Sequence, residues 1–260
     1  MPRFPRLSSS LTQGLSALAL AFGASHLVYA AVAAPVPALF GDAAINQQLS
    51  MEQRLERAEA VTAVSNVMGR YSFLHTAGRH TESESLFALD TPGVRVEMMW
   101  GVYEGAHSIH RLYSGMHVDT EGVNQRKGQM HIHTLSTPVI EVAGDLKTAK
   151  AVWVSPGVET GFFGSDKVTA NWGWAKYGAD FIKENGEWKI WHLHVYGLFL
   201  SPYDKSWVQQ PNDHQMPPLP DAFKPDRPGT THWMYSADKP TELVPAPPAP
   251  YMSFDDKTAY

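Results

Sequence analysis

Hydrophobic side chains recur at helical spacing over about residues 50–78, at the start of the region predicted to fold. From Ser50 onward, apolar or small residues return every three or four positions until the pattern ends near Gly78. This spacing predicts one long amphipathic helix with Ser50 as its N-cap. A short second helix is expected over residues 81–89 and a third over residues 105–117, each with its apolar side chains turned inward.

Apolar runs separated by turn residues follow these helices. Gly144-Asp145 and Asn185-Gly186 supply hairpin turns, because Asn and Gly tolerate the positive φ that a tight hairpin requires. Helices first and hairpins afterwards predict an α+β fold, with the helices packed on one face of a curved antiparallel sheet. The runs predict strands over residues 94–100, 130–142, 148–156 and 168–183, and a last strand that ends near Tyr196.

The segment 172–196, WGWAKYGADFIKENGEWKIWHLHVY, carries a dense set of ring-bearing side chains. On its second strand, alternation places Trp188, Ile190, His192, His194 and Tyr196 on one face. Two imidazoles and a phenol beside a tryptophan are unusual in a sheet packed only for stability. We therefore expect this face to line an internal cavity, where function should be sought.

The N-terminus has the features of a secretory signal peptide over residues 1–34. Arg3 and Arg6 precede an apolar run over residues 15–34, and Ala31-Val32-Ala33 offers small residues where a signal peptidase cleaves. Cleavage predicts a periplasmic or secreted protein with no membrane association afterwards. An uncleaved anchor is the alternative, because the run is nearly long enough to span a bilayer.

Two segments of different composition flank the region predicted to fold, residues 50–200. Residues 35–49 are expected to form a linker. Residues 201–260 contain 12 of the 19 prolines, together with scattered aromatic residues. Disordered tails are usually poor in aromatic residues, so we expect an extended arm that packs on its own domain or on a neighbour. Disorder beyond Lys239 is the alternative.

The composition narrows the possible functions. The 260 residues carry a formal net charge of -5 and the 21 Lys and Arg residues form no block, so no nucleic-acid partner is expected. The chain has no cysteine, which excludes disulfides, thiolate catalysis and thiolate metal sites. It also has no Gly-rich nucleotide-binding loop. A small-molecule substrate fits these properties, and no cofactor is expected.

Four segments, in this order, carry a resemblance to a known family. They are RY at 70–71 with LFA at 86–88, WGVYEGAHSI at 100–109, the strand 133–140 followed by VAGD at 142–145, and YGADF at 177–181 with GEWKI at 186–190. Over about residues 50–200 the chain resembles the SnoaL-like branch of the nuclear-transport-factor-2-like superfamily. The resemblance implies a cone of curved antiparallel sheet closed by three helices around an apolar cavity. It also implies a homo-oligomer.

The resemblance also implies where the catalytic groups lie. His133 matches a cavity-facing histidine of dehydratase members, Tyr71 a tyrosine late in the first helix, and Trp188 a tryptophan inside the cone. His75 stands near the position of the acidic residue that the family usually has, which favours histidine as the acid–base group. The predicted catalytic residues are His133, His75, Tyr71, His192 and His194, and the predicted substrate-binding residues are Trp100, Tyr103, His131, Trp172, Trp174, Tyr177 and Tyr196.

The spacing of the histidines also permits a metal interpretation. His131 and His133, and likewise His192 and His194, are alternate strand residues that project together and can share one ion. Neither flanking segment brings a well-placed carboxylate, and the resemblance is mainly to metal-free enzymes. The sequence therefore predicts no metal.

The expected function is that of a cofactor-independent lyase acting on a bulky hydroxylated aromatic substrate. The Trp-, His- and Tyr-rich segments are similar to those of lyases that release formaldehyde from lignin-derived aromatic dimers, such as diarylpropanes or phenylcoumarans. A dehydratase, cyclase or isomerase acting on a steroid- or polyketide-like ligand is the enzymatic alternative. A non-catalytic periplasmic binding module is the third interpretation, because this fold often forms dimers through its sheet.

Overall fold

The computed structural model of the chain describes residues 42–116, 127–161, 167–209 and 219–260. The predicted signal peptide, the first part of the predicted linker and the end of the third predicted helix lie outside these residues. The chain divides into two units, Met1–Val36 and Pro37–Tyr260, and the described residues all belong to the second. Within the described ranges, no helix has both the length and the apolar character needed to cross a bilayer.

The helices follow the predicted order, with changes in length. Ser50 caps the long helix as expected, because its hydroxyl accepts from the Gln53 N–H at 3.2 Å while the Gln53 side chain accepts from the Ser50 N–H at 2.9 Å. A short helix lies within the predicted linker, and the second predicted helix is only five residues long. The helices are α1 (Asp42–Asn46), α2 (Met51–Thr76), α3 (His80–Glu84) and α4 (Gly105–His110), which continues as the π-helical η1 (Arg111–Gly115).

Seven strands form one sheet in the order β2-β1-β7-β6-β5-β3, and β4 also pairs with β5. β1 runs parallel to β7, so the sheet is mixed and not wholly antiparallel as predicted. The run predicted as one strand over residues 130–142 is divided by a short break into β3 and β4. The strand predicted over residues 94–100 corresponds to β1, and β2 is an additional strand that follows it. The strands are β1 (Arg95–Met98), β2 (Gly101–Glu104), β3 (Met130–His133), β4 (Ser136–Val142), β5 (Thr148–Gly161), β6 (Thr169–Glu184) and β7 (Glu187–Pro202).

The β6–β7 hairpin forms at the predicted turn. Asn185 and Gly186 both have positive φ, 53° and 85°, the conformation that a two-residue hairpin loop requires. The two long strands then pair along nearly their whole length. The pairing of the two longest strands of the sheet is thus specified by a local signal.

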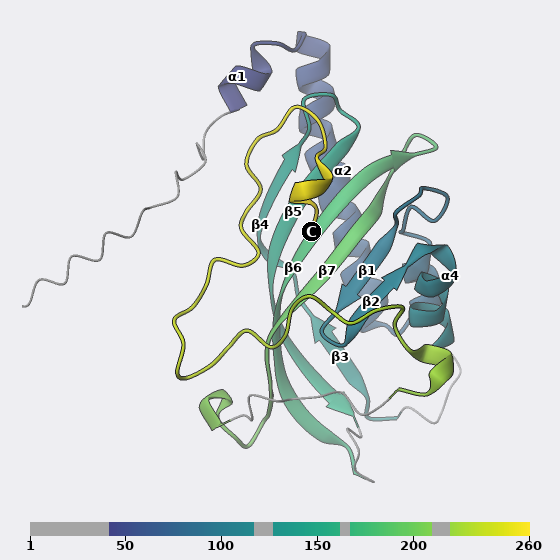
Figure 1. The fold of residues 1–260 in the computed structure, drawn as a ribbon, viewed down its shortest axis with the longest axis vertical. Helices are drawn as coiled ribbons and strands as arrows, with labels where there is room; N and C mark the ends of the chain where they lie inside the picture. The colour runs from purple at the N-terminus through teal and green to yellow at the C-terminus, as the bar shows by residue number, and fades with distance from the viewer. Residues whose placement is uncertain (1–41, 117–126, 162–166, 210–218) are drawn as a thin grey trace, which may run out of the picture. The chain divides into compact units, whose positions relative to one another are not determined.

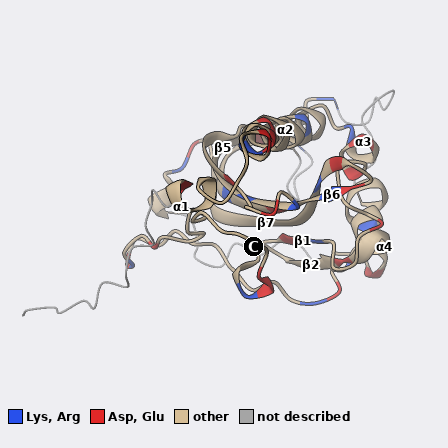
Figure 2. Cartoon of the chain, turned by 90° about the horizontal axis from the view of Figure 1, so that it is seen from above, with Lys and Arg blue, Asp and Glu red and all other residues tan. Residues whose placement is uncertain are grey.

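The two faces of the sheet are covered by different parts of the chain. Helix α2 packs on what we call the inner face, where Val64, Met68 and Tyr71 meet core residues of β5, β6 and β7. Residues 219–260, the C-terminal arm, cross the opposite or outer face, as the yellow trace in Figure 1 shows. In Figure 2, α2 and the C-terminus lie on opposite sides of β7.

Backbone hydrogen bonds attach the arm to its own domain. The Met234 N–H donates to the Gly197 carbonyl at 3.0 Å, and the Gly144 N–H donates to the Tyr251 carbonyl at 2.9 Å. The arm therefore satisfies backbone groups of the sheet and its turns instead of extending into solvent.

A buried ion network lies between the outer face and the end of the arm. The carboxylate of Asp180 accepts from Lys150 Nζ and from His192 Nδ1, each at 2.8 Å, and from the Tyr260 N–H at 2.9 Å. Lys150 Nζ also donates to the Thr258 carbonyl at 2.8 Å. The Asp180 side chain has no exposed surface, so its charge depends on these donors.

We expect Asp180→Asn to destabilise the protein by about 3–5 kcal/mol, because it leaves the buried Lys150 ammonium without its counter-charge. The free energy of unfolding in urea measures this change. Asp221→Asn is the control, since the Asp221–Lys224 pair lies in solvent and should contribute nothing measurable. Equal unfolding midpoints for the two variants would contradict the proposed role of Asp180.

Candidate functional site

The register between β6 and β7 decides which side chains of β7 face the core. Ile190 lies opposite Phe181, but His192 lies opposite the adjacent residue Asp180, so Trp191 is an extra residue in β7. Such a β-bulge shifts the alternation of a strand by one position. Ile190 is therefore part of the core, and His192 points to the outer face.

The sequence analysis assigned one inner face to the whole of β7, and this is wrong beyond the bulge. Trp188 packs against the core as expected. His192, His194 and Tyr196 lie instead on the face that the arm covers; His194 Nε2, for example, is 2.9 Å from Thr231 Oγ1. These three residues are thus separated from His133 by the sheet itself.

The predicted aromatic walls are also divided between locations. Trp172 and Trp174 lie on the outer face of β6, where each stacks on a neighbouring aromatic ring. Trp100 donates its Nε1–H to the Tyr103 hydroxyl at 3.0 Å, and that hydroxyl donates to the Phe223 carbonyl of the arm at 2.9 Å. The structure therefore does not bring these four residues together with Tyr71 and His133.

Three tyrosine hydroxyls lie on the inner face beneath α2. The Tyr71 and Tyr113 hydroxyl oxygens are 2.9 Å apart, and the Tyr177 ring meets the Tyr71 ring edge-on, with 6.5 Å between centroids. Burial raises the pKa of Tyr71 to about 12 and holds the pKa values of Tyr113 and Tyr177 well above the usual range. All three phenols are therefore protonated near neutrality. Tyr113 was not singled out from the sequence.

Four histidine rings lie beside these tyrosines. The His75 ring is parallel to the Tyr71 ring, with 6.1 Å between centroids. It also lies 5.1 Å from the ring of His133, 5.6 Å from that of His80 and 6.4 Å from that of His131. Because these residues come from α2, α3 and β3, only the tertiary fold brings them together.

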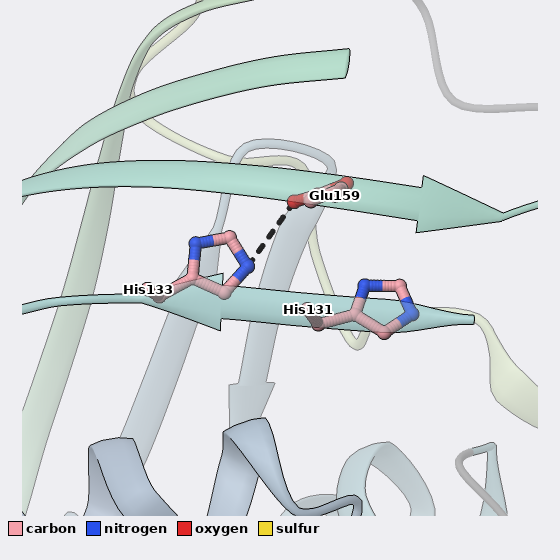
Figure 3. A group of neighbouring side chains, drawn as sticks. All are labelled: His131, His133 and Glu159. Atoms are coloured by element: carbon pink, nitrogen blue, oxygen red, sulfur yellow. Dashed lines mark ion pairs between the residues drawn. The ribbon is translucent and has the colours of Figure 1, made fainter. Parts of the chain in front are cut away.

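His133 forms a pair with Glu159 of β5, drawn as a dashed line in Figure 3. The two atoms, His133 Nε2 and Glu159 Oε1, are 3.1 Å apart, and the side chains are 16% and 17% exposed. The Ser72 hydroxyl of α2 donates to the His133 carbonyl at 2.6 Å, which fixes the end of β3 against the helix. A histidine held by a carboxylate and still reachable from solvent can accept and return a proton.

Two glycines leave room for this pair. Gly157 and Gly173 lie opposite each other on β5 and β6. A Cβ at Gly157 would lie 3.0 Å from His133 Nδ1, and one at Gly173 would lie 3.4 Å from Glu159 Oε1. A Cβ at Gly157 would also lie 2.7 Å from the carbonyl oxygens of Gly173 and Ile132, so a larger residue there would displace the backbone of β3 or β6 as well as crowd the imidazole.

The sequence analysis missed Glu159 because it ended the strand at Pro156. In the structure β5 continues to Gly161, and Pro156 lies opposite the break between β3 and β4. There its missing N–H interrupts no pairing with either strand, and its carbonyl accepts from Thr134. Glu159 also supplies the carboxylate whose absence led the sequence analysis to set a metal site aside.

Comparison with protein families gives one match over more than half of the chain. The model of the SnoaL-like domain matches residues 56–194, which include most of α2, the sheet up to His194 and the His133–Glu159 pair. The chain belongs to the SnoaL-like family. This confirms the resemblance inferred from the sequence and the α+β fold that it implied.

Solved structures with similar folds are distant from this SnoaL-like chain in sequence. A putative scytalone dehydratase from Novosphingobium aromaticivorans is 15% identical, with a TM-score of 0.44, over 60% of this chain and 94% of that one. A hexachlorocyclohexane dehydrochlorinase, LinA type 2, is 14% identical, with a TM-score of 0.46, over 57% and 92%. A putative NTF2-like dehydratase from Streptomyces avermitilis is 16% identical, with a TM-score of 0.45, over 55% and 99%. No protein of curated function matches the sequence.

The outer face of this SnoaL-like domain has its own cavity, of about 840 Å³, between the sheet and the arm. Arg95, Glu97, His194 and Tyr196 are among its lining residues. Burial lowers the pKa of His194 to about 4, although the charge of Glu97, 3.3 Å away, acts in the opposite direction. His194 is therefore neutral near pH 7.

We expect His194 to make the fold less stable as the pH falls from about 6.5 to about 4. Its folded-state pKa is depressed, so in this window the unfolded chain binds a proton that the folded chain does not. Urea unfolding at several pH values in this range measures how the free energy of unfolding changes with pH. His194→Gln should reduce this change while preserving the contact to Thr231. Identical slopes in the parent and the variant would contradict the assignment.

Proposed function

We propose that the chain is a cofactor-independent lyase that acts on a bulky hydroxylated aromatic substrate at the inner face. The observation that carries this proposal is the His133–Glu159 pair, whose imidazole lies 5.1 Å from the His75 ring, which in turn lies 6.1 Å from the ring of Tyr71. Elimination needs a proton acceptor and a proton donor at one place, and this cluster offers both. Membership of the SnoaL-like family supports small-molecule chemistry in this part of the fold.

The proposed substrate is an aromatic dimer with a propanediol side chain and a para-hydroxyl group, as in lignin-derived diarylpropanes. Protonation of the benzylic hydroxyl releases water, and loss of the phenolic proton converts the ring into a quinone methide. A base then takes the proton of the terminal hydroxymethyl group, the carbon–carbon bond breaks and formaldehyde leaves. The bonding electrons return to the ring as a phenolate, leaving a stilbene-type alkene. The substrate's own ring is the electron sink.

The residues have complementary roles in this scheme. The His133–Glu159 pair is the base, because the Glu159 carboxylate lies 3.1 Å from His133 Nε2 and can orient the imidazole. Tyr71 and Tyr113 donate to the departing hydroxyl, because burial keeps them protonated. The same groups suit a dehydratase, which would stop after water loss and release no formaldehyde.

We expect His133→Ala and Glu159→Gln each to lower kcat by about 10²- to 10⁴-fold, the usual cost of losing a general acid–base group. Turnover is followed as formaldehyde and alkene released from a diarylpropane diol. His110→Ala is the matched control, because His110 forms a similar pair with Glu84, also at 3.1 Å, outside the cluster. It should change kcat by less than a few-fold.

A structural histidine would give a different result. In that case His133→Ala would lower the unfolding midpoint and leave the turnover of the remaining folded protein close to that of the parent. This outcome, or an equal loss of activity in His110→Ala, would refute the catalytic assignment. Loss of water without release of formaldehyde would support the catalytic role of the His133–Glu159 pair and would identify the enzyme as a dehydratase.

We also expect turnover to survive exhaustive chelation, because the quinone-methide route requires no metal. The measurement compares kcat before and after removal of divalent ions from the purified protein. Loss of activity on chelation, with recovery on adding one divalent ion per chain, would instead make a bound metal part of the reaction.

A further inference from the structure

His131 belongs to the histidine cluster but has no part in the proton transfer assigned to His133 and Glu159. It lies on β3 directly opposite Glu159 of β5, and two residues before His133, so the three side chains project from one face of the sheet, as Figure 3 shows. One ligand atom from each lies within 4.8 Å of those of the other two. We propose that His131, His133 and Glu159 bind one divalent transition-metal ion, with Zn²⁺ as the best match.

The distances suit a tetrahedral ion. Zinc bonds of about 2.0–2.2 Å to nitrogen and oxygen place neighbouring ligand atoms about 3.3–3.6 Å apart. His133 Nε2 and Glu159 Oε1, at 3.1 Å, are already close to this separation. The widest separation in the group, at most 4.8 Å, must close by about 1 Å. Small χ rotations of His131 and Glu159 are sufficient to close this distance, because both side chains are only partly buried.

The ligand types select the class of metal. Two imidazoles and one carboxylate favour Zn²⁺, Co²⁺ or Ni²⁺, whereas Ca²⁺ and Mg²⁺ prefer sites made of oxygen atoms alone. Three protein ligands leave one position of a tetrahedron for water or a substrate oxygen. The Ser72 hydroxyl, which donates to the His133 carbonyl, holds the backbone of β3 in place and limits the rearrangement that binding requires.

Metal binding has a consequence beyond the proposed function. The ion would take the nitrogen lone pair of His133 and a carboxylate oxygen of Glu159, which are the groups that proton transfer needs. Metal binding and proton transfer at this place therefore exclude each other. The metal-free protein is the active form, and Zn²⁺ is a reversible inhibitor that competes for the base.

Titration of metal-free, substrate-free protein with Co²⁺ tests the site directly. Tetrahedral or five-coordinate Co²⁺ absorbs visible light strongly, so the spectrum reports coordination, and Zn²⁺ should displace it with loss of colour. We expect one Co²⁺ per chain and at least about a tenfold weaker affinity in His131→Gln and in Glu159→Gln. His110→Ala, at the exposed His110–Glu84 pair, should bind Co²⁺ like the parent.

The possible outcomes separate the metal site from the lyase. No coloured complex, or unchanged affinity in both His131→Gln and Glu159→Gln, would overturn the site without bearing on turnover, because no substrate is present. Unfolding midpoints establish that each variant is folded; His131→Gln keeps a polar side chain of similar length for this purpose. If the complex forms and saturating Zn²⁺ leaves turnover unchanged, the metal site stands and the assignment of His133–Glu159 as the base fails.

Discussion

The period-two alternation of side chains along β7, together with its interruption at Trp191, determines what each face of the sheet can do. One extra residue sends Ile190 into the core and His192 to the outer face. Trp191 itself is held outside the ladder by its Nε1–H, which donates to the Pro92 carbonyl at 2.9 Å, and by stacking on His192 at 4.3 Å between centroids. A strand without this bulge would place His192 among apolar core residues, far from the carboxylate that now satisfies it.

The two faces therefore carry different kinds of polar chemistry. On the outer face the polar groups neutralise one another: Asp180 is saturated by donors from the sheet and from the arm, and little remains to act on a ligand at that point. On the inner face the polar groups are phenols, imidazoles and the carboxylate of Glu159, which lies 3.1 Å from His133 Nε2. Such groups remain able to exchange protons, which is why the inner face is the better candidate for catalysis.

Local signals made part of this arrangement predictable from the sequence. The N-cap at Ser50 and the hairpin at Asn185-Gly186 each depend on neighbouring residues, and both are confirmed. The apolar period of α2 is confirmed only in its second half, where Met68 and Tyr71 are buried, because Leu55 in its first half is exposed. Tyr71, His75 and His133 were predicted to lie together, and they do. The bulge at Trp191 could not be predicted, because it depends on how β6 and β7 align over their whole length. Glu159 could not be assigned to the strand from the sequence, because a proline such as Pro156 normally ends a strand. Pro156 fits within β5 only because it lies opposite the break between β3 and β4.

The inner site also separates donors from the acceptor by burial. Tyr71 and Tyr113 are deep enough that desolvation keeps them protonated far above neutral pH, whereas His133 and Glu159 retain partial contact with solvent. A proton donor and a proton acceptor are both in their working form at one pH when the pKa of the donor lies above that of the acceptor. Burial beneath α2 favours this order, because it raises the pKa values of the two tyrosines. It follows that a competing cation should act on the solvent-reachable pair and not on the buried phenols.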